Sequence, residues 1–169
     1  MTERGATVSA RMVLTDPVHL LAFGFGAGLA PKAPGTAGTL VAVPMAVALL
    51  QLPVLWRLLP VLLVCLLGVW ICDRSSRALG VHDHPGIVWD EIAGYLLTVA
   101  LFPLDLITLG GGFVLFRAFD IIKPPPIRQV DRNLSGGIGI MLDDLIAALF
   151  AAACLVGLRW SLGVPLTAL

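Results

Sequence analysis

Residues 54–72 read VLWRLLPVLLVCLLGVWIC, and this stretch decides the class of fold. Arg57 is its one charged side chain, so a helix built from it is apolar on every side, as buried and lipid-facing helices are. Similar apolar runs occur at residues 39–51, 92–104, 106–119 and 145–160. The sequence therefore predicts an all-α protein of about five short apolar helices. A further helix at the N-terminus begins at Asp16-Pro17, a capping side chain followed by a proline.

The composition places these helices in a membrane. Apolar residues make up 58% of the 169 residues and charged residues 13%, against roughly 45–50% and about 25% in a soluble domain. The mean hydropathy is +0.95. Such a chain cannot be disordered or form a coiled coil. Eleven basic residues balance eleven acidic ones, which also excludes a nucleic-acid-binding module. We expect one compact helical membrane domain over residues 1–169, with a flexible tail at residues 1–15.

The charged residues show how the chain crosses the membrane. Nine of the eleven acidic residues lie between Asp73 and Asp144, and all of these except Asp105 are in two acid-rich segments expected to be loops. The apolar runs are mostly shorter than the roughly 20 residues of an untilted span, so tilting or local thinning of the bilayer would have to compensate. Basic residues accompany both loops, and the positive-inside rule then places them together on the cytoplasmic face of a multi-pass protein.

The first acid-rich segment contains Asp83, His84, Asp90 and Glu91. A helix is expected to begin near Pro85, which places Asp90 and Glu91 one to two turns inside it, at the mouth of an apolar run. Carboxylates there are costly unless they are paired or bind a cation. The alternative is a capping acid with a solvated pair at the membrane interface.

The second acid-rich segment places Arg117, Asp120 and Lys123 at three-residue steps on a helix that Pro124 ends. On this evidence, a ladder of ion pairs explains these three residues as well as a functional site does. Asp143 and Asp144 are expected to open the last apolar helix, where one carboxylate would suffice to complement the helix dipole.

Together these residues predict a divalent metal site that binds a phosphate ester. The carboxylates are hard oxygen ligands, which suit Mg²⁺ or Mn²⁺. The candidate metal ligands are Asp83, Asp90, Glu91, Asp120, Asp143 and Asp144. The candidate substrate-binding residues form two groups. Basic side chains suit phosphate oxygens, and they are Arg117, Lys123 and Arg128. Small residues at the start of a helix either bind an anion or form a simple turn, and they are Gly35, Thr36 and Thr39. At a membrane surface, the expected substrate is a lipid phosphate.

Five motifs resemble those of the bacterial phosphatidylglycerophosphatase A family. They are FGFGAGLAP (23–31), PGTAGTL (34–40), HDHPGIVWDE (82–91), FRAFDIIKP (116–124) and GGIGIMLDD (136–144). The resemblance implies a Mg²⁺-dependent enzyme of the bacterial inner membrane, with phosphatidylglycerophosphate as substrate and phosphatidylglycerol and orthophosphate as products. It leaves the oligomeric state open.

The motifs that the sequence contains or lacks indicate the nucleophile of the reaction. The sequence has no Cys-x₅-Arg loop and no Asp-x-Asp-x-Thr motif, so metal-activated water is the expected nucleophile and an aspartyl-phosphate the alternative. The candidate catalytic residues are Asp83, His84, Asp90, Glu91, Asp120 and Asp144. Arg117 and Lys123 would hold the phosphate, and His84 or Asp83 would transfer the proton.

Three other functions use similar residues. A small cation transporter or channel could use the same carboxylates, although acids at helix ends beside arginines, with no internal repeat, argue against it. A CDP-alcohol phosphotransferase also needs aspartates at a membrane face, but its Asp-Gly-x₂-Ala-Arg pattern is absent. Another lipid phosphatase, such as a phosphatidic acid phosphatase, stays open, since the choice among lipid phosphates rests on the resemblance.

Overall fold

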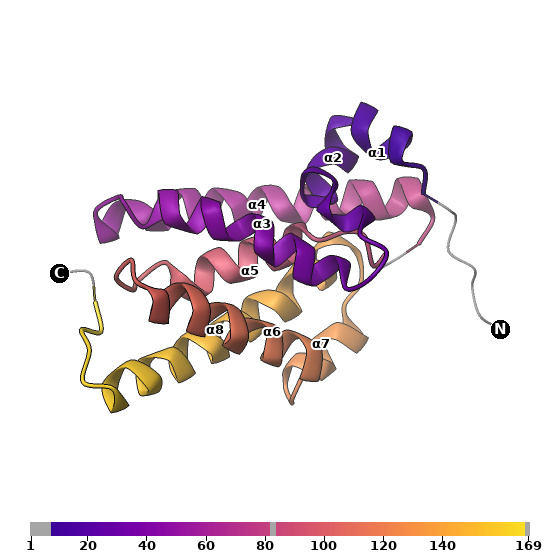
Figure 1. Ribbon diagram of the computed structural model, residues 1–169. Helices are drawn as coiled ribbons and strands as arrows, with labels where there is room; N and C mark the ends of the chain where they lie inside the picture. The colour runs from indigo at the N-terminus through magenta and orange to yellow at the C-terminus, as the bar shows by residue number, and fades with distance from the viewer. Residues whose placement is uncertain (1–7, 82–83, 168–169) are drawn as a thin grey trace.

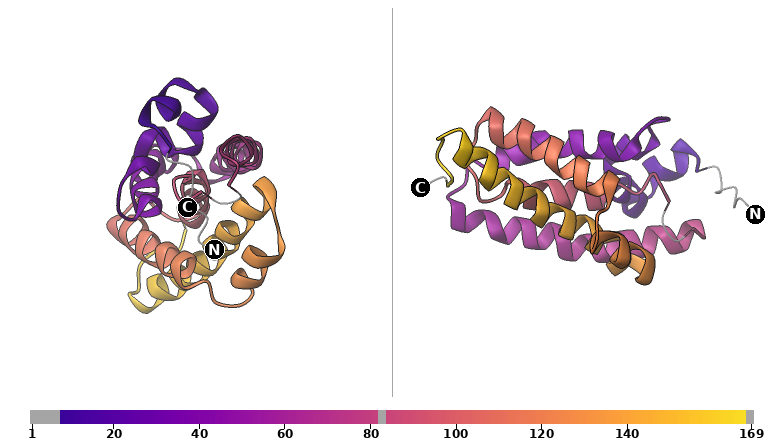
Figure 2. Two further views of the ribbon diagram at one scale, coloured as in Figure 1. Left: turned by 90° about the vertical axis from the view of Figure 1, so that its right-hand side faces the viewer. Right: turned by 90° about the horizontal axis from the view of Figure 1, so that it is seen from below.

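Helix α5, Trp89–Val99, lies in the middle of the molecule (Figure 2). All its residues are buried except Glu91 and Leu97, which are partly exposed. Helices α3, α4, α6 and α8 all pack against it. A short helix with an apolar surface on nearly every side needs such neighbours, so α5 organises the core and fixes the direction in which its first turn points.

The computed structural model describes residues 8–81 and 84–167, and the regular structure in this part of the chain is entirely helical (Figure 1). This confirms the all-α class. Besides α5, the α-helices are α1 (Ala10–Thr15), α2 (Pro17–Ala22), α3 (Pro34–Leu49), α4 (Val54–Leu79), α6 (Gly112–Ile122), α7 (Ile127–Asn133) and α8 (Gly136–Ser161). Two irregular turns of helix, η1 (Gly24–Leu29) and η2 (Ile107–Gly111), precede α3 and α6.

The N-terminal helices form a small cap at one end of the bundle (Figure 1). Asp16 caps α2 as predicted, because its carboxylate accepts the backbone N–H groups of Val18 and His19. Helix α1 occupies residues that were expected to belong to a flexible tail, since Val13 is fully buried. Residues 1–7 lie outside the described part.

Helices α4 and α8 are 26 residues long, much longer than the sequence predicted. Helix α4 continues through the polar residues 73–79 because Asp73 and Arg77 form an ion pair at 3.0 Å one turn apart. Helix α8 begins at Gly136 because Asp73 also accepts the N–H of Gly137 at 3.3 Å. Asp143 and Asp144 therefore lie about two turns inside α8 and do not open it.

The loops at the opposite end are held by two buried arginines. Arg57 donates to the backbone oxygens of Leu50, Leu52, Ala100 and Phe102. Arg159, wholly buried, donates to the backbone oxygen of Pro165 and forms an ion pair with Asp105. Arg57 satisfies carbonyls at the C-terminal ends of α3 and α5, and Arg159 links the segment after α8 to Asp105. These arginines therefore stabilise the end of the bundle far from the acid-rich motifs.

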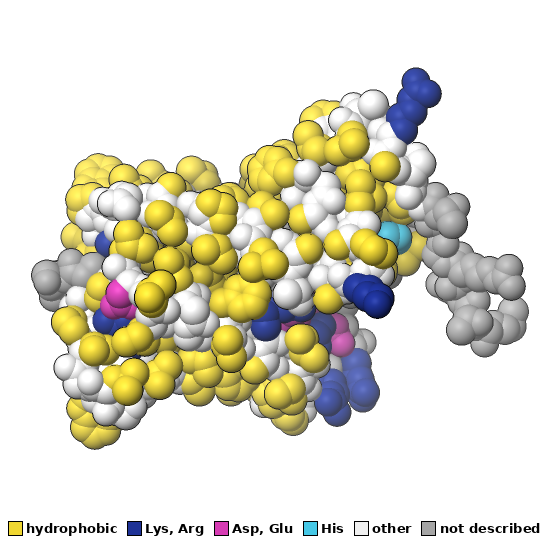
Figure 3. Space-filling view, in the orientation of Figure 1, with side chains coloured by type: hydrophobic (Ala, Val, Ile, Leu, Met, Phe, Trp, Pro, Cys, Tyr) yellow, Lys and Arg dark blue, Asp and Glu magenta, His cyan; other side chains and the backbone are white. Residues whose placement is uncertain are grey.

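Two helices in the described part, α4 and α8, are long and apolar enough to cross a membrane. In α8, half of the most apolar 18-residue stretch is buried inside the protein. In α4, only 22% of the corresponding stretch is buried. The outer face of α4 carries exposed leucines and two exposed tryptophans, Trp56 and Trp70. Hydrophobic side chains also cover most of the face in Figure 3. This amount of exposed apolar surface is typical of a protein that contacts lipid.

Candidate active site

Helices α5, α6 and α8 direct their acidic side chains into one cavity of about 260 Å³. The first turn of α3 closes it from the other side. The lining residues are Ala33, Pro34, Gly35, Pro85, Ile87, Asp90, Glu91, Arg117, Asp120, Ile121, Lys123, Asp143 and Asp144. The tertiary structure thus joins four of the five sequence motifs at one place.

Three carboxylates form the centre of this cavity. One oxygen each from Asp90, Glu91 and Asp144 lies within 4.8 Å of the other two. Asp90 and Asp144 are buried and Glu91 is nearly so. The atoms Asp90 Oδ1, Glu91 Oε2 and Asp144 Oδ2 are buried and have no hydrogen-bond partner among residues 8–81 and 84–167. Buried acceptors without partners are costly, and a bound cation would satisfy all three.

The basic side chains lie at the edge of this acid triad (Asp90, Glu91 and Asp144). Arg117 forms an ion pair with Asp120 one turn away and approaches Glu91 to 3.6 Å. The side chains of Arg117 and Asp120 are both almost completely buried. The arginine therefore contributes a fixed positive charge beside the triad, with its orientation set by Asp120.

Lys123 is held in a similar way. It is the C-cap of α6 and has a left-handed backbone with φ of 44°. Pro124 is the next residue in the chain. Its ammonium group pairs with Asp143 and, at 2.7 Å, with Asp131. Burial acts to lower the pKa of Lys123, but its hydrogen bonds to Asp131 and Asp143 outweigh burial and raise the pKa above its ordinary value. The group is therefore a cation at any physiological pH.

The electrostatics of the triad favour a cation. Burial raises the pKa of Asp90 well above its ordinary value, and the nearby charges of Glu91 and Asp144 raise it further. Burial also raises the pKa of Glu91, to about 7. Clustered carboxylates out of water cannot all ionise without compensation. They must either share protons or hold a metal ion.

Two glycines let the helices approach closely enough to form the site. A side chain at Gly35 would collide with Glu91 and crowd Arg117, and one at Gly94 would overlap the ring of Phe116. The start of α3 therefore packs against the acidic turn of α5, and α5 packs against α6 and α8.

Comparison with known proteins shows the family of the chain. The family model for phosphatidylglycerophosphatase A matches residues 20–159. The phosphatidylglycerophosphatase A of Escherichia coli is 44% identical over 160 residues, 92% of each chain. The chain belongs to the phosphatidylglycerophosphatase A family.

Two further relatives cover most of the chain. Phosphatidylglycerophosphatase A of Haemophilus influenzae is 42% identical over 152 residues, which are 89% of this chain and 93% of the relative. A Bacteroides thetaiotaomicron protein provisionally named phosphatidylinositol-3-phosphatase is 34% identical over 152 residues, 85% of this chain and 94% of the relative. No solved structure matches the chain.

The structure separates the residues that the family motifs suggested. Of the six candidate metal ligands, Asp90, Glu91 and Asp144 converge, while Asp120 pairs with Arg117 and Asp143 with Lys123. The remaining candidate, Asp83, lies outside the described residues. Because α5 begins at Trp89, Asp90 and Glu91 occupy its first turn, which is closer to the helix end than predicted.

The other candidate residues lie around the cavity. Gly35 lines it, and the buried Thr39 donates from its hydroxyl to the backbone oxygen of Gly35. Thr36, in the first turn of α3, and the exposed Arg128 are not among the lining residues. His84 accepts the N–H of Gly86 at 3.0 Å and lies beside the ring of Phe23, in the turn that leads into α5.

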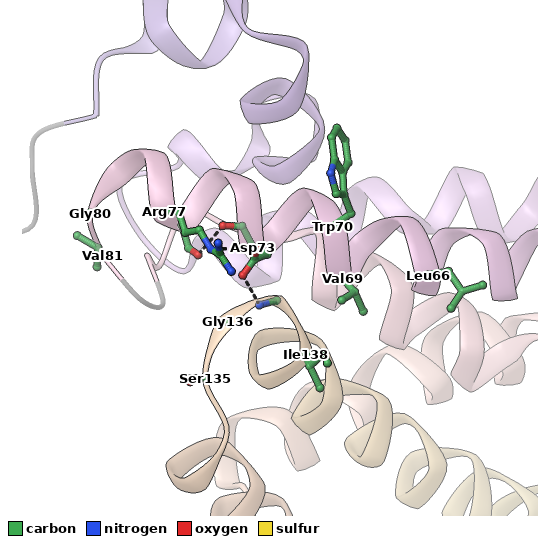
Figure 4. Close-up of a pocket in the computed structure, with 12 residues that line it drawn as sticks. Leu66, Val69, Trp70, Asp73, Arg77, Gly80, Val81, Ser135, Gly136 and Ile138 are labelled. Atoms are coloured by element: carbon green, nitrogen blue, oxygen red, sulfur yellow. Dashed lines mark hydrogen bonds and ion pairs between the residues drawn. The ribbon is translucent and has the colours of Figure 1, made fainter.

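Sequence analysis missed one lining residue of interest, Ile121. It is four residues after Arg117, and this helical spacing could have revealed that both side chains line the cavity. A larger cavity of about 760 Å³, which no sequence pattern indicated, lies between α4 and the start of α8 (Figure 4). Asp73 lies there between Arg77 and the first residues of α8, and none of the acid triad lines it.

Proposed function

We propose that this chain hydrolyses phosphatidylglycerophosphate to phosphatidylglycerol and orthophosphate. The observation that carries the proposal is the buried acid triad beside Arg117 and Lys123, in a member of the phosphatidylglycerophosphatase A family. A phosphomonoester needs positive partners for its oxygens. The cavity provides these at its edge and leaves room for a cation at its centre.

The residues of the triad fit a Mg²⁺ ion. They offer three carboxylate oxygens within 4.8 Å of one another, and oxygen is the ligand that Mg²⁺ prefers. Asp90, Glu91 and Asp144 would hold the ion. When bound, it would lower the pKa of a water molecule and neutralise charge on the phosphoryl oxygens.

The protein's own side chains then position the substrate. Arg117 and Lys123 would bind the phosphate oxygens that face away from the triad. Asp120 and Asp143 each hold one of these cations in place, so we assign them positioning roles. His84, in the turn before α5, is the candidate for proton transfer to the leaving glycerol oxygen.

We also propose that α4 and α8 cross the bacterial inner membrane, with the site at its cytoplasmic surface. A 26-residue helix is about 39 Å long, longer than the ~30 Å hydrocarbon core. The polar C-terminal end of α4 therefore extends into the headgroup region. Arg74 and Arg77 on α4 and Lys123 and Arg128 near the site lie at this end, and basic residues favour the cytoplasmic side.

A phosphoinositide is the second candidate substrate, because of the Bacteroides thetaiotaomicron relative at 34% identity. Both substrates are lipid phosphomonoesters, and the acid triad would treat the phosphate of each in the same way. Parallel measurements with the two lipids separate these possibilities through the ratio of their kcat/KM values.

The test is release of phosphate from phosphatidylglycerophosphate by the purified protein in detergent micelles. We expect EDTA to stop release and Mg²⁺ to restore it. Asp90→Asn should abolish turnover, whereas Asp131→Asn, outside the triad, should retain most of it. If folded wild-type protein releases no phosphate with any divalent metal, the proposed function is wrong.

A further inference from the structure

Helix α6 has an apolar stripe, Val114 and Ile121, that no helix in the described part of the chain covers. Val114 is 66% exposed and Ile121 is 68% exposed. They are seven residues apart, which places them on the same face of a helix. Phe116 and Asp120, on other faces of α6, are buried. The exposed stripe therefore begins in the apolar part of α6 and ends in its last turn.

The stripe ends at the candidate active site. Ile121 lines the same cavity as Asp120, Lys123 and the acid triad. Across this cavity lie Pro34 and Gly35, and α3 exposes Leu40, at 57%, just beyond them. Figure 3 shows charged side chains gathered in a narrow patch where α3 begins and α6 ends, bordered by hydrophobic surface toward the middle of the bundle. The cavity thus has one polar border and one apolar border.

The direction of the stripe matches the shape of a phospholipid. From Ile121 back to Val114 the helix runs about 10 Å along its axis, away from the charged end of the molecule and toward the apolar middle. A phosphate bound by Arg117 and Lys123 would leave the acyl chains of its lipid on this side. Ile121 lies close to the charged side chains, where water reaches the surface of the protein. Transfer of its side chain from water to the hydrocarbon of an acyl chain is therefore favourable.

We propose that the α6 stripe, Val114 and Ile121, holds the acyl chains of the substrate, and that Ile121 makes the enzyme prefer a long-chain lipid phosphomonoester to a short-chain one. This inference rests on the proposed function, because it assumes that the phosphate binds beside the acid triad. Ile121 is a specificity residue in this scheme. The acyl chains enter between α3 and α6 and extend toward the bilayer interior.

The experiment compares kcat/KM for dioleoyl and dihexanoyl phosphatidylglycerophosphate in mixed micelles of fixed composition. Ile121→Asn should reduce the preference for the dioleoyl substrate about tenfold, the order expected when one aliphatic side chain loses its apolar contact. Asparagine is uncharged, so it does not repel the phosphate. Ile121→Val, which restores an apolar surface, should return the preference to near the wild-type ratio.

Ile138→Asn is the matched control. Ile138 is 58% exposed in the first turn of α8, at the same end of the molecule, and it lines the larger cavity of Figure 4 but not the acid cavity. We expect it to keep the wild-type preference. An equal loss in this variant, or an unchanged preference in Ile121→Asn, would overturn the inference.

The same measurements distinguish an error in this inference from an error in the proposed function. Wild-type protein that hydrolyses neither lipid contradicts the proposed function and the inference together. Wild-type protein that hydrolyses both lipids equally well contradicts only the role of the α6 stripe. If Ile121→Asn does not fold, the same ratio measured for Ile121→Ala decides, since alanine also removes most of the apolar contact.

Discussion

The replacement of Asp144 by asparagine should stabilise the protein without metal and abolish its response to Mg²⁺. Asp144 is buried, and its oxygen lies within 4.8 Å of oxygens of Asp90 and Glu91. At an effective dielectric constant of about 20, two full charges 4.8 Å apart repel by about 3.5 kcal/mol. Protons shared within the triad cancel much of this repulsion, so we expect Asp144→Asn to gain about 1–2 kcal/mol.

Thermal unfolding of the detergent-solubilised protein measures this gain. For a chain of this size 1 kcal/mol corresponds to about 2–4 °C in Tm, so Asp144→Asn should unfold about 2–8 °C higher than wild type in EDTA. With Mg²⁺ at ten times its Kd, the wild type should gain about 1.4 kcal/mol, or about 3–6 °C. The variant should gain almost nothing, because one of three ligands has lost its charge.

Asp131→Asn is the control for this experiment. Its carboxylate pairs with Lys123 but lies outside the triad, so this variant should keep the wild-type shift with Mg²⁺. The reasoning is refuted if Asp144→Asn lowers the Tm in EDTA and retains the full Mg²⁺ shift. In that case the triad would be held together by protons and hydrogen bonds, and the metal would bind elsewhere.

Two further predictions concern the close approach of α3 and the opposite end of the bundle. Gly35→Ala should reduce kcat/KM by at least ~10²-fold, as small displacements in active sites do, because the new side chain displaces Glu91 and Arg117. Gly157→Ala, which adds a side chain to open space in α8, should leave phosphate release unchanged, and equal activity in both variants would contradict this account. Arg159→Met should cost about 1–3 kcal/mol of stability, because it removes the buried hydrogen bonds from Arg159 to Pro165, Thr108 and Asp105. Its kcat/KM per folded molecule should equal that of wild type in the same phosphate-release assay, and a selective loss of activity would show that this end affects catalysis.

Several helix boundaries could be predicted because their causes are local. Asp16-Pro17 starts α2 through a side chain that caps its own neighbours. Pro124 follows the end of α6 directly because it cannot continue the helix. The starts of α5 and α8 were predicted less well, since their causes are distant in sequence. The start of α8 depends on a hydrogen bond to Asp73 of α4, which no local pattern reveals.

The candidate site shows the same division. Sequence patterns identified nearly all of its charged side chains, because acidic and basic residues are conspicuous in so apolar a chain. They could not tell apart the two kinds of carboxylate. Asp120 and Asp143 face a cation, whereas Asp90, Glu91 and Asp144 face one another. These partners depend on how α5, α6 and α8 pack.

The sequence by itself determined that the protein is helical, exposes much apolar surface and carries acidic and basic residues of the types that suit a metal ion and a phosphate. These properties follow from composition and from interactions between neighbouring residues. Only the tertiary structure decided which acids converge, which acids pair with Arg117 and Lys123, and that Ile121 lines the same cavity. The physical reason is that charge compensation acts through space over a few ångströms, and distances of this kind are set by helix packing.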